Sequence, residues 1–297
     1  MGKILKLNAN AKINLGLDVL GRRKDGYHDV RMIMQTLDYG DTVTLEKKPG
    51  LGITLECDDP RISDGDDNFA MKAAKQFEKE YNSRFSDEFK GWDFGMHIRL
   101  RKRIPLSAGL GGGSADAAAV IKGMNSLFDT GLGRESLMNM GAAVGSDVPF
   151  CIIGRTALAE GRGEELTPIP DFPHCHVLVV KPDISISTGE AYDSLDGMDY
   201  LEHPDIYALE DSIVKKKEIR EIVSFMGNTF ENPMISRYPV IGEIKKSMED
   251  AGALKAMMTG SGPSVFGIFE DEDTMRDAKD EAERKFDSAY VFESTTH

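Results

Sequence analysis

The sequence predicts an α+β fold, because strand-like and helix-like patterns interleave along the 297 residues without a regular strand–helix–strand repeat. Polar and apolar residues alternate through roughly the first 60 residues, which indicates strands. Later, residues 114–128 repeat apolar side chains at helical spacing. With 40% hydrophobic and 29% charged residues, the composition is that of a folded protein with a substantial core.

The first half begins with strands and continues with a helix. The alternating segments KILKL, INLGLDVLG, VRMIMQTLDYGD, DTVTLEKK and GITLEC predict strands. Asp66 and Asp67 can then cap a helix that carries an apolar face. That face consists of Ala70, Ala73, Ala74, Phe77 and Tyr81. The segment FGMHIRLRKRI predicts a further strand.

A glycine-rich loop runs from Pro105 directly into a helix that starts near Ser114. Glycines allow positive φ and a close approach of the backbone to a ligand. Successive N–H groups can then converge on an anion, and the helix N-terminus adds its positive dipole end. We therefore predict a phosphate site at Gly109 and Gly111–Gly113, although a tight turn without a ligand is the alternative.

Three familiar nucleotide-binding motifs are excluded. A P-loop needs GxxxxGK[ST], but the only Gly-Lys pair is Gly2-Lys3. A dinucleotide fingerprint would need a glycine where Ser114 stands. The tripeptide Asp-Phe-Gly at residues 93–95 lacks the other protein-kinase motifs, so we interpret it as chance.

The second half mixes strands at residues 156–160 and 177–181 with helices near residues 205–226 and 237–250. A second glycine loop, Thr259–Ser264, lies between two apolar strands, and a helix follows. Alone this loop predicts a hairpin turn, but together with the first loop it could close over the same ligand. A charge step and the stretch GRGEE place a boundary near residues 155–160, so we predict domains at residues 1–157 and 158–297.

The net charge of −14 is confined to the second half of the chain. Residues 1–150 hold 21 basic and 21 acidic side chains, whereas residues 151–297 hold 15 and 29. This balance argues against nucleic-acid or anionic-membrane partners but leaves room for a local anion site in the neutral half.

No CxxC pair or signal-peptide pattern is present, so we expect a cytoplasmic protein with reduced thiols. Residues 174–176 (His-Cys-His) alternate faces on a strand and cannot converge on zinc.

The two glycine loops together resemble the GHMP small-molecule kinase family. Its hallmark is P-x-x-x-G-L-G-[GS]-[GS]-S, and Pro105–Ser114 matches it at every fixed place. Thr259–Ser264 resembles the family's third motif, and the resemblance extends from about Ala9 to Phe269. It implies a two-domain GHMP kinase fold with an active-site cleft between the domains, and ATP as the phosphoryl donor.

More specific elements resemble one branch of this family. They are AKINLGLDVLGRRKDGYHDV, LDYGD at residues 37–41, GLGGGSADAA and GSDVPF at residues 145–150. That branch phosphorylates the 2-hydroxyl of the methylerythritol moiety of a cytidine diphosphate ester, in non-mevalonate isoprenoid precursor synthesis. The partner implied is therefore a small molecule, and the sequence leaves monomer and homodimer open.

The resemblance implies a role for each matching residue. Lys12 and Asp147 match the catalytic pair. The implied ATP-binding residues are Pro105, Leu106, Ser107, Ala108, Gly109, Leu110, Gly111, Gly112, Gly113, Ser114 and Asp116, with Asn68 and Lys102 near the adenine. The implied substrate-binding residues are Asn14, Tyr27, His28, Tyr192, Gly260, Ser261 and Gly262, the tyrosines and His28 holding cytosine.

Two details qualify this assignment. Ala115 stands where many relatives have a second serine, so a side-chain phosphate contact is absent there while the backbone cradle is unaffected. Mg²⁺ is expected with the ATP phosphates, held mostly by phosphate oxygens and water, with Ser114 as a candidate contact and no tightly bound cofactor.

The residue types suit this chemistry. Asp147 and Lys12 are lone charges in apolar surroundings, and an ion pair between them would orient the carboxylate to accept a hydroxyl proton. A structural salt bridge is the alternative. Tyr27 and His28 offer a π face and a donor–acceptor edge for a base, or form a surface turn.

Two other functions remain open from the sequence. The chain could be another GHMP kinase, such as a homoserine or mevalonate kinase, although the Asp-Gly-Tyr-His element at residues 25–28 favours a cytidine ligand. A non-catalytic nucleotide sensor is disfavoured because both Lys12 and Asp147 are present.

Overall fold

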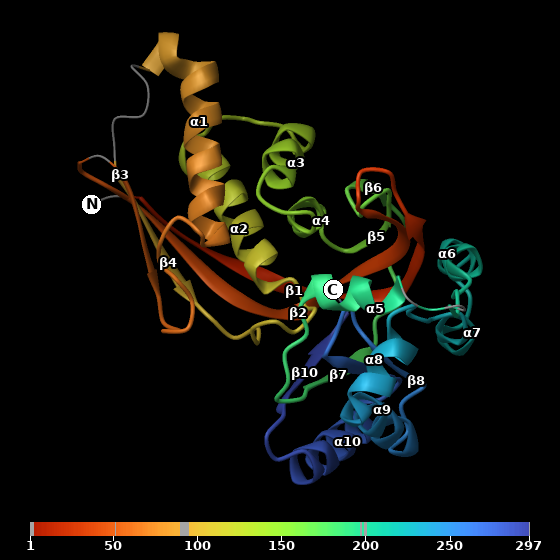
Figure 1. The fold of residues 1–297 in the computed structure, drawn as a ribbon. Coiled ribbons are helices and arrows are strands. Elements are labelled where there is room, and N and C mark those ends of the chain that lie inside the picture. The colour runs from red at the N-terminus through yellow and green to blue at the C-terminus, as the bar shows by residue number, and fades with distance from the viewer. Residues whose placement is uncertain (1–2, 51, 90–94, 197, 199–200, 297) are drawn as a thin grey trace. The chain divides into compact units, whose positions relative to one another are not determined.

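The computed structural model describes residues 3–50, 52–89, 95–196, 198 and 201–296 (Figure 1). The first half contains β1 (Ile4–Arg22), β2 (His28–Lys48), β3 (Gly52–Cys57), α1 (Phe69–Phe89), β4 (Gly95–Arg101), α2 (Gly112–Leu127), α3 (Arg134–Ala142) and α4 (Val148–Ile153). The second half contains β5 (Thr156–Glu160), β6 (Glu165–Pro168), β7 (His176–Lys181), α5 (Thr188–Leu195), α6 (Ile206–Val214), α7 (Ile219–Ser224), α8 (Glu231–Arg237), α9 (Pro239–Asp250), β8 (Lys255–Met258), β9 (Val265–Phe269), α10 (Glu272–Lys285) and β10 (Tyr290–Thr295). The predicted mixture of strands and helices is confirmed.

The chain forms two compact units that are discontinuous in sequence. The first unit comprises Met1–Ala11, Gly40–Ile104 and Gly111–Gly154, and the second comprises Lys12–Tyr39, Pro105–Leu110 and Arg155–His297. The long strands β1 and β2 contribute residues to both units, where the sequence suggested shorter strands. The predicted division at residue 157 and the predicted cleft stay predictions.

The first unit packs two helices on a sheet. The second half of β2 pairs antiparallel with β4, and β4 pairs parallel with β3. Their alternate side chains, such as Leu45 and Ile98, share one core with Phe77 of α1 and Ile121 of α2. In Figure 1, α1 (orange) and α2 (yellow-green) run side by side. A Cβ at Gly123 would lie 2.5 Å from Leu45 Cδ1, so the alanine- and glycine-rich α2 lies close on the sheet.

The second unit contains an antiparallel sheet with the strand order β10–β7–β9–β8. Its registers include Val180↔Val265 and Met258↔Val265, so the turn after β8 leads straight back into β9. Helices α9 and α10 pack on this sheet. In the same unit, the first half of β2 pairs with β5 from Met32↔Ala159 to Gln35↔Thr156. The buried strands β8 and β9 of the four-stranded sheet therefore hold Thr259–Ser264, the second glycine loop, between them.

Two predicted helical stretches of the second half differ in detail. The stretch near residues 205–226 forms two helices, because Lys216 takes a φ of +52° between them. Pro239 starts α9 directly after α8, since proline cannot continue a helix but fits its first turn. Within the described ranges, no helix is both long and apolar enough to cross a membrane.

Candidate functional site

The first glycine loop packs against the second one in the second unit. Gly109 has a φ of +73°, and a Cβ on it would lie 2.5 Å from the carbonyl oxygen of Thr259 and 3.2 Å from that of Gly262. Real Cβ atoms do not come so close to an oxygen, so only glycine fits here. The structure thus brings together the two loops that the sequence suggested could act on one ligand.

Lys12 lies where these loops meet strand β1. Its backbone N–H donates to the Leu110 carbonyl at 3.0 Å, and its Nζ donates to Asn14 Oδ1 at 2.9 Å. The backbone N–H of Asn14 donates to Thr259 Oγ1 at 3.0 Å. Lys12 and Asn14 are 5% and 1% exposed, so a cation is buried against the loops. A Cβ at Gly260 would lie 3.5 Å from that Nζ.

Two residues that the sequence did not single out support the second loop. Asn228 Nδ2 donates to the carbonyls of Met258 and Gly260, at 2.8 and 2.9 Å. Glu231 accepts from the Met258 N–H at 2.7 Å. Both lie about 30 residues before the loop in a region without a recognisable motif, so no sequence signal pointed to them. Buried amide and carboxylate groups of this kind rigidify the backbone that they hold.

His28 and Tyr192 form a stacked pair in the second unit. Their ring centroids are 4.6 Å apart with an interplanar angle of 18°. His28 Nε2 lies 2.9 Å from Asp196 Oδ1, which holds the imidazole edge-on. Tyr27, by contrast, is 58% exposed, with Arg162 over its ring at 5.1 Å. The structure therefore joins two of the three predicted aromatic residues and leaves Tyr27 outside the stack.

In the first unit, the glycine loop ends at the start of α2. Gly111 caps this helix with a φ of +70°, so Gly112, Gly113 and Ser114 form its first turn. The N–H groups of a first turn have no partner within the helix and carry the positive end of its dipole. A 16-residue helix preceded by glycines is suited to an anion.

Two other predicted residues of the first unit have local positions. Asp147 is half-buried directly before α4, as its apolar neighbours suggested. Asn68 uses its amide to cap α1: Nδ2 donates to the Ser63 carbonyl at 2.7 Å, and Oδ1 accepts from the Ala70 N–H at 2.8 Å. Their catalytic and adenine-binding roles stay predictions, as does the pairing of Asp147 with Lys12, which belongs to the other unit.

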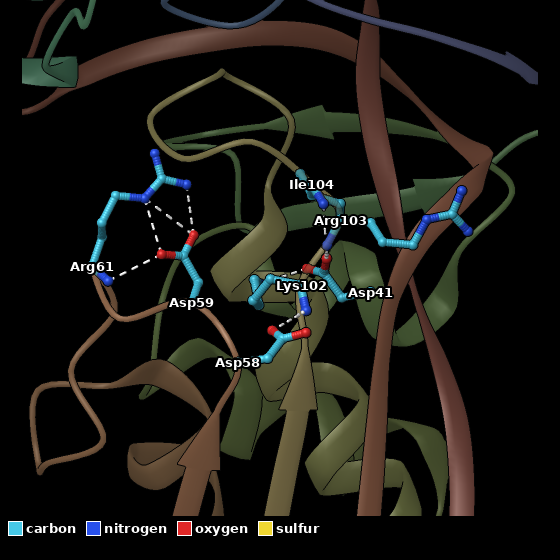
Figure 2. A network of polar contacts seen from close by, with 7 residues as sticks. All are labelled: Asp41, Asp58, Asp59, Arg61, Lys102, Arg103 and Ile104. Atoms are coloured by element: carbon cyan, nitrogen blue, oxygen red, sulfur yellow. Dashed lines mark hydrogen bonds and ion pairs between the residues drawn. The ribbon is translucent and has the colours of Figure 1, made fainter.

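Lys102 lies in a buried ion cluster with Asp41 and Asp116. Its Nζ donates to Asp41 Oδ2 at 2.5 Å and forms a second, short contact with Asp116 Oδ2. The three side chains are 7%, 0% and 4% exposed. Figure 2 shows Asp41 next to Lys102, with the Lys102 N–H bound by Asp58. The Lys102 ammonium thus forms ion pairs with two carboxylates. The sequence analysis did not predict this cluster.

Burial sets the protonation of this cluster. It raises the pKa of Asp116 to about 7, an effect that the nearby Lys102 opposes. Burial disfavours the charged Lys102 too, but Asp116 and Asp41 outweigh it and raise the pKa of Lys102. Asp116 Oδ1 is buried and has no hydrogen-bond partner in the described part of the chain. With two carboxylates and one ammonium, protonation of Asp116 makes the cluster neutral.

Among the described residues, no group of three or more His, Cys, Asp or Glu side chains is arranged to hold a metal ion. The Asp116 carboxylate is covered and already faces an ammonium, so it offers no open metal ligand. Ser114, in the first turn of α2, is the one predicted contact that the helix start could present. Its role stays a prediction.

Comparison with known proteins agrees with this fold and with the two glycine loops. A model of the GHMP kinases N terminal domain matches residues 68–155, and a model of the GHMP kinases C terminal region matches residues 209–288. Fold and site together define a small-molecule phosphotransferase. The chain belongs to the GHMP kinase family, as its sequence motifs predicted.

Individual relatives are more specific. A 4-diphosphocytidyl-2-C-methyl-D-erythritol kinase of Lachnospira eligens is 42% identical over 98% of both chains. The enzyme of the same name from Acetivibrio thermocellus is 47% identical over 90% of this chain and 91% of its own. A crystal structure of 4-(cytidine 5'-diphospho)-2C-methyl-D-erythritol kinase superimposes with a TM-score of 0.79 at 30% identity, covering 98% of this chain and 99% of the other.

The buried Asp116 predicts a pH-dependent stability. With a pKa near 7 in the folded protein and about 4 in the unfolded chain, the folded state binds this proton more tightly. The free energy of unfolding then falls as the pH rises from about 4 to about 7. The Asp116→Asn variant should lose this slope, measured as the difference in Tm between pH 5 and pH 8.

Asp59→Asn is the matched control. Hydrogen bonds from Arg61 lower the pKa of Asp59 to about 2, so this carboxyl does not titrate between pH 5 and pH 8. The control should keep the wild-type slope. Parallel pH curves for Asp116→Asn and the wild type would contradict the assignment.

Proposed function

We propose that the chain transfers the γ-phosphoryl group of ATP to the 2-hydroxyl of 4-diphosphocytidyl-2-C-methyl-D-erythritol, in non-mevalonate isoprenoid precursor synthesis. The observation that carries this proposal is the 42% identity, over 98% of the chain, to a kinase named for that substrate. A cytoplasmic location is supported by the three free cysteines, which are typical of a reducing compartment.

The donor would bind at the start of α2. Residues Gly111–Ser114 would offer backbone N–H groups and the positive end of the helix dipole to the β- and γ-phosphates. Mg²⁺ would enter with ATP as part of the substrate, coordinated by phosphate oxygens and water, with the Ser114 hydroxyl beside it.

The acceptor would bind in the second unit. The stacked pair His28–Tyr192 offers a flat apolar face and a polar edge, which are the features that a pyrimidine base requires. Lys12 and Asn14 would contact the reacting end of the acceptor, since both side chains lie against the second glycine loop. Homoserine and mevalonate contain no nucleobase that could stack on His28 and Tyr192.

Catalysis would rest on position and charge. Phosphoryl transfer demands an in-line hydroxyl and stabilisation of the charge that spreads over the phosphate oxygens. We assign Asp147 as the base that accepts the hydroxyl proton, and Lys12 as the cation that orients it. Lys12 is held in place by Asn14 and by the Leu110 carbonyl, so it is already ordered before substrates bind.

An acceptor panel tests the function. Purified protein with MgATP should release ADP, in a coupled assay, with the cytidylated methylerythritol as acceptor. It should release much less with homoserine, mevalonate or uncytidylated methylerythritol, because these ligands lack the base that His28 and Tyr192 would stack on. Faster ADP release with a non-cytidylated alcohol would establish a different GHMP kinase.

The variant Asp147→Asn tests the proposed base. The amide is isosteric but cannot accept the proton, so kcat should fall by about 10²–10⁴-fold. The Kd for MgATP should stay within about twofold, because no phosphate contact is assigned to Asp147.

The matched control is Asp129→Asn, an exposed carboxylate of the same unit after α2, which should keep wild-type turnover. A kcat for Asp147→Asn equal to that of the control would refute the general-base role.

A further inference from the structure

The carboxylate of Asp41 holds the backbone that leads into the first glycine loop. Asp41 lies within β2 and its side chain is fully buried. Its Oδ1 accepts hydrogen bonds from the N–H groups of Arg103 and Ile104, at 2.5 and 2.8 Å. These are the last two residues before Pro105, where the loop begins. Figure 2 shows both bonds converging on Asp41.

The other oxygen of Asp41 reaches the far end of the same loop through Lys102. Its Oδ2 binds the Lys102 ammonium at 2.5 Å, and that ammonium also binds Asp116 in the second turn of α2. Direct packing adds to this connection. A Cβ at Gly112 would lie 3.0 Å from Ile104 Cγ2 and 3.7 Å from Asp41 Oδ2. One buried cluster therefore fixes the residues on both sides of the loop.

We infer that Asp41 is a positioning residue for ATP. By tying Arg103 and Ile104 to the start of α2, it sets the distance that residues 105–111 must span and the direction of the N–H groups of the first helical turn. The inference rests on the proposed function in one respect, namely that the ATP phosphates bind at this helix start.

An aspartate is required for this role because the site offers three donors. One carboxylate accepts from two N–H groups and one ammonium at once. An asparagine keeps one acceptor oxygen, and its NH₂ group faces either the ammonium or the backbone N–H groups. In the Asn variant, at least one of these three buried donors has no acceptor. The backbone before the loop would then shift to find another partner.

The variant Asp41→Asn tests the inference through binding. Isothermal titration should show the Kd for MgATP rising by about tenfold or more, the loss expected for a charged hydrogen bond. The KM for the cytidylated acceptor should stay within about twofold, since His28 and Tyr192, which are proposed to hold its base, belong to the other unit. This split between the two substrates is a result that general loosening of the fold would not produce.

The matched control is Asp59→Asn. Asp59 pairs with Arg61 in the same unit, but Arg61 is 71% exposed, so the pair lies at the surface. Its Kd for MgATP should stay within about twofold of wild type. An Asp41→Asn protein that binds MgATP as tightly as this control, or that weakens both substrates in parallel, would overturn the inference. Wild-type protein that binds no MgATP would instead count against the proposed function.

A second pair of variants decides the question if Asp41→Asn does not fold. Lys102→Met leaves Asp41 and Asp116 facing each other without a cation and should weaken MgATP binding about tenfold or more. Adding Asp116→Asn replaces the buried acid that has lost its cation with a neutral amide and should restore most of that loss. Without such recovery, Lys102 would contact ATP directly and the positioning role would be wrong.

Discussion

The close approach of Gly109 to the Thr259–Ser264 turn is the constraint on which the site depends. With the Thr259 carbonyl 2.5 Å from where a Cβ would stand, the two loops touch through their backbones. The same contact region holds Lys12, whose N–H binds the next residue of the first loop and whose ammonium lies against Gly260. A larger residue at Gly109 would separate the loops and displace the surroundings of the cation.

One buried lysine in each unit, Lys12 in the second and Lys102 in the first, contacts a different set of groups. In the second unit, the Lys12 ammonium donates to the amide oxygen of Asn14 at 2.9 Å. In the first unit, the Lys102 ammonium forms ion pairs with the carboxylates of Asp41 and Asp116, which flank the first glycine loop. The two lysines that the resemblance assigns to one active site are therefore held by different groups in their own units. Under the proposed function, Lys12 would act on the reacting groups, and Lys102 would stabilise the backbone on either side of the phosphate site.

Much of the fold and part of the site could be predicted from the sequence because their signals are local. Alternation along residues 4–48 and helical spacing after Ser114 follow from neighbouring side chains, and both glycine loops are contiguous. The ion cluster could not be predicted in this way, since 61 residues separate Asp41 from Lys102 and nothing in either segment marks the partner. The same applies to Asn228, which binds a loop 30 residues later. The sequence left both a stacking role and a surface turn open for Tyr27, because residue type indicates stacking ability but not the direction of a side chain.

The most direct test of this account compares the steady-state kcat/KM of Gly109→Ala and Gly131→Ala in the ADP-release assay. Both glycines have positive φ, +73° and +64°, so alanine strains the backbone equally at the two positions. Only Gly109 has a carbonyl oxygen in the way, whereas Gly131 has no atom within 4 Å of an added Cβ. The account predicts a loss of about 100-fold for Gly109→Ala and near-wild-type activity for Gly131→Ala. Equal activity of the two variants would contradict it.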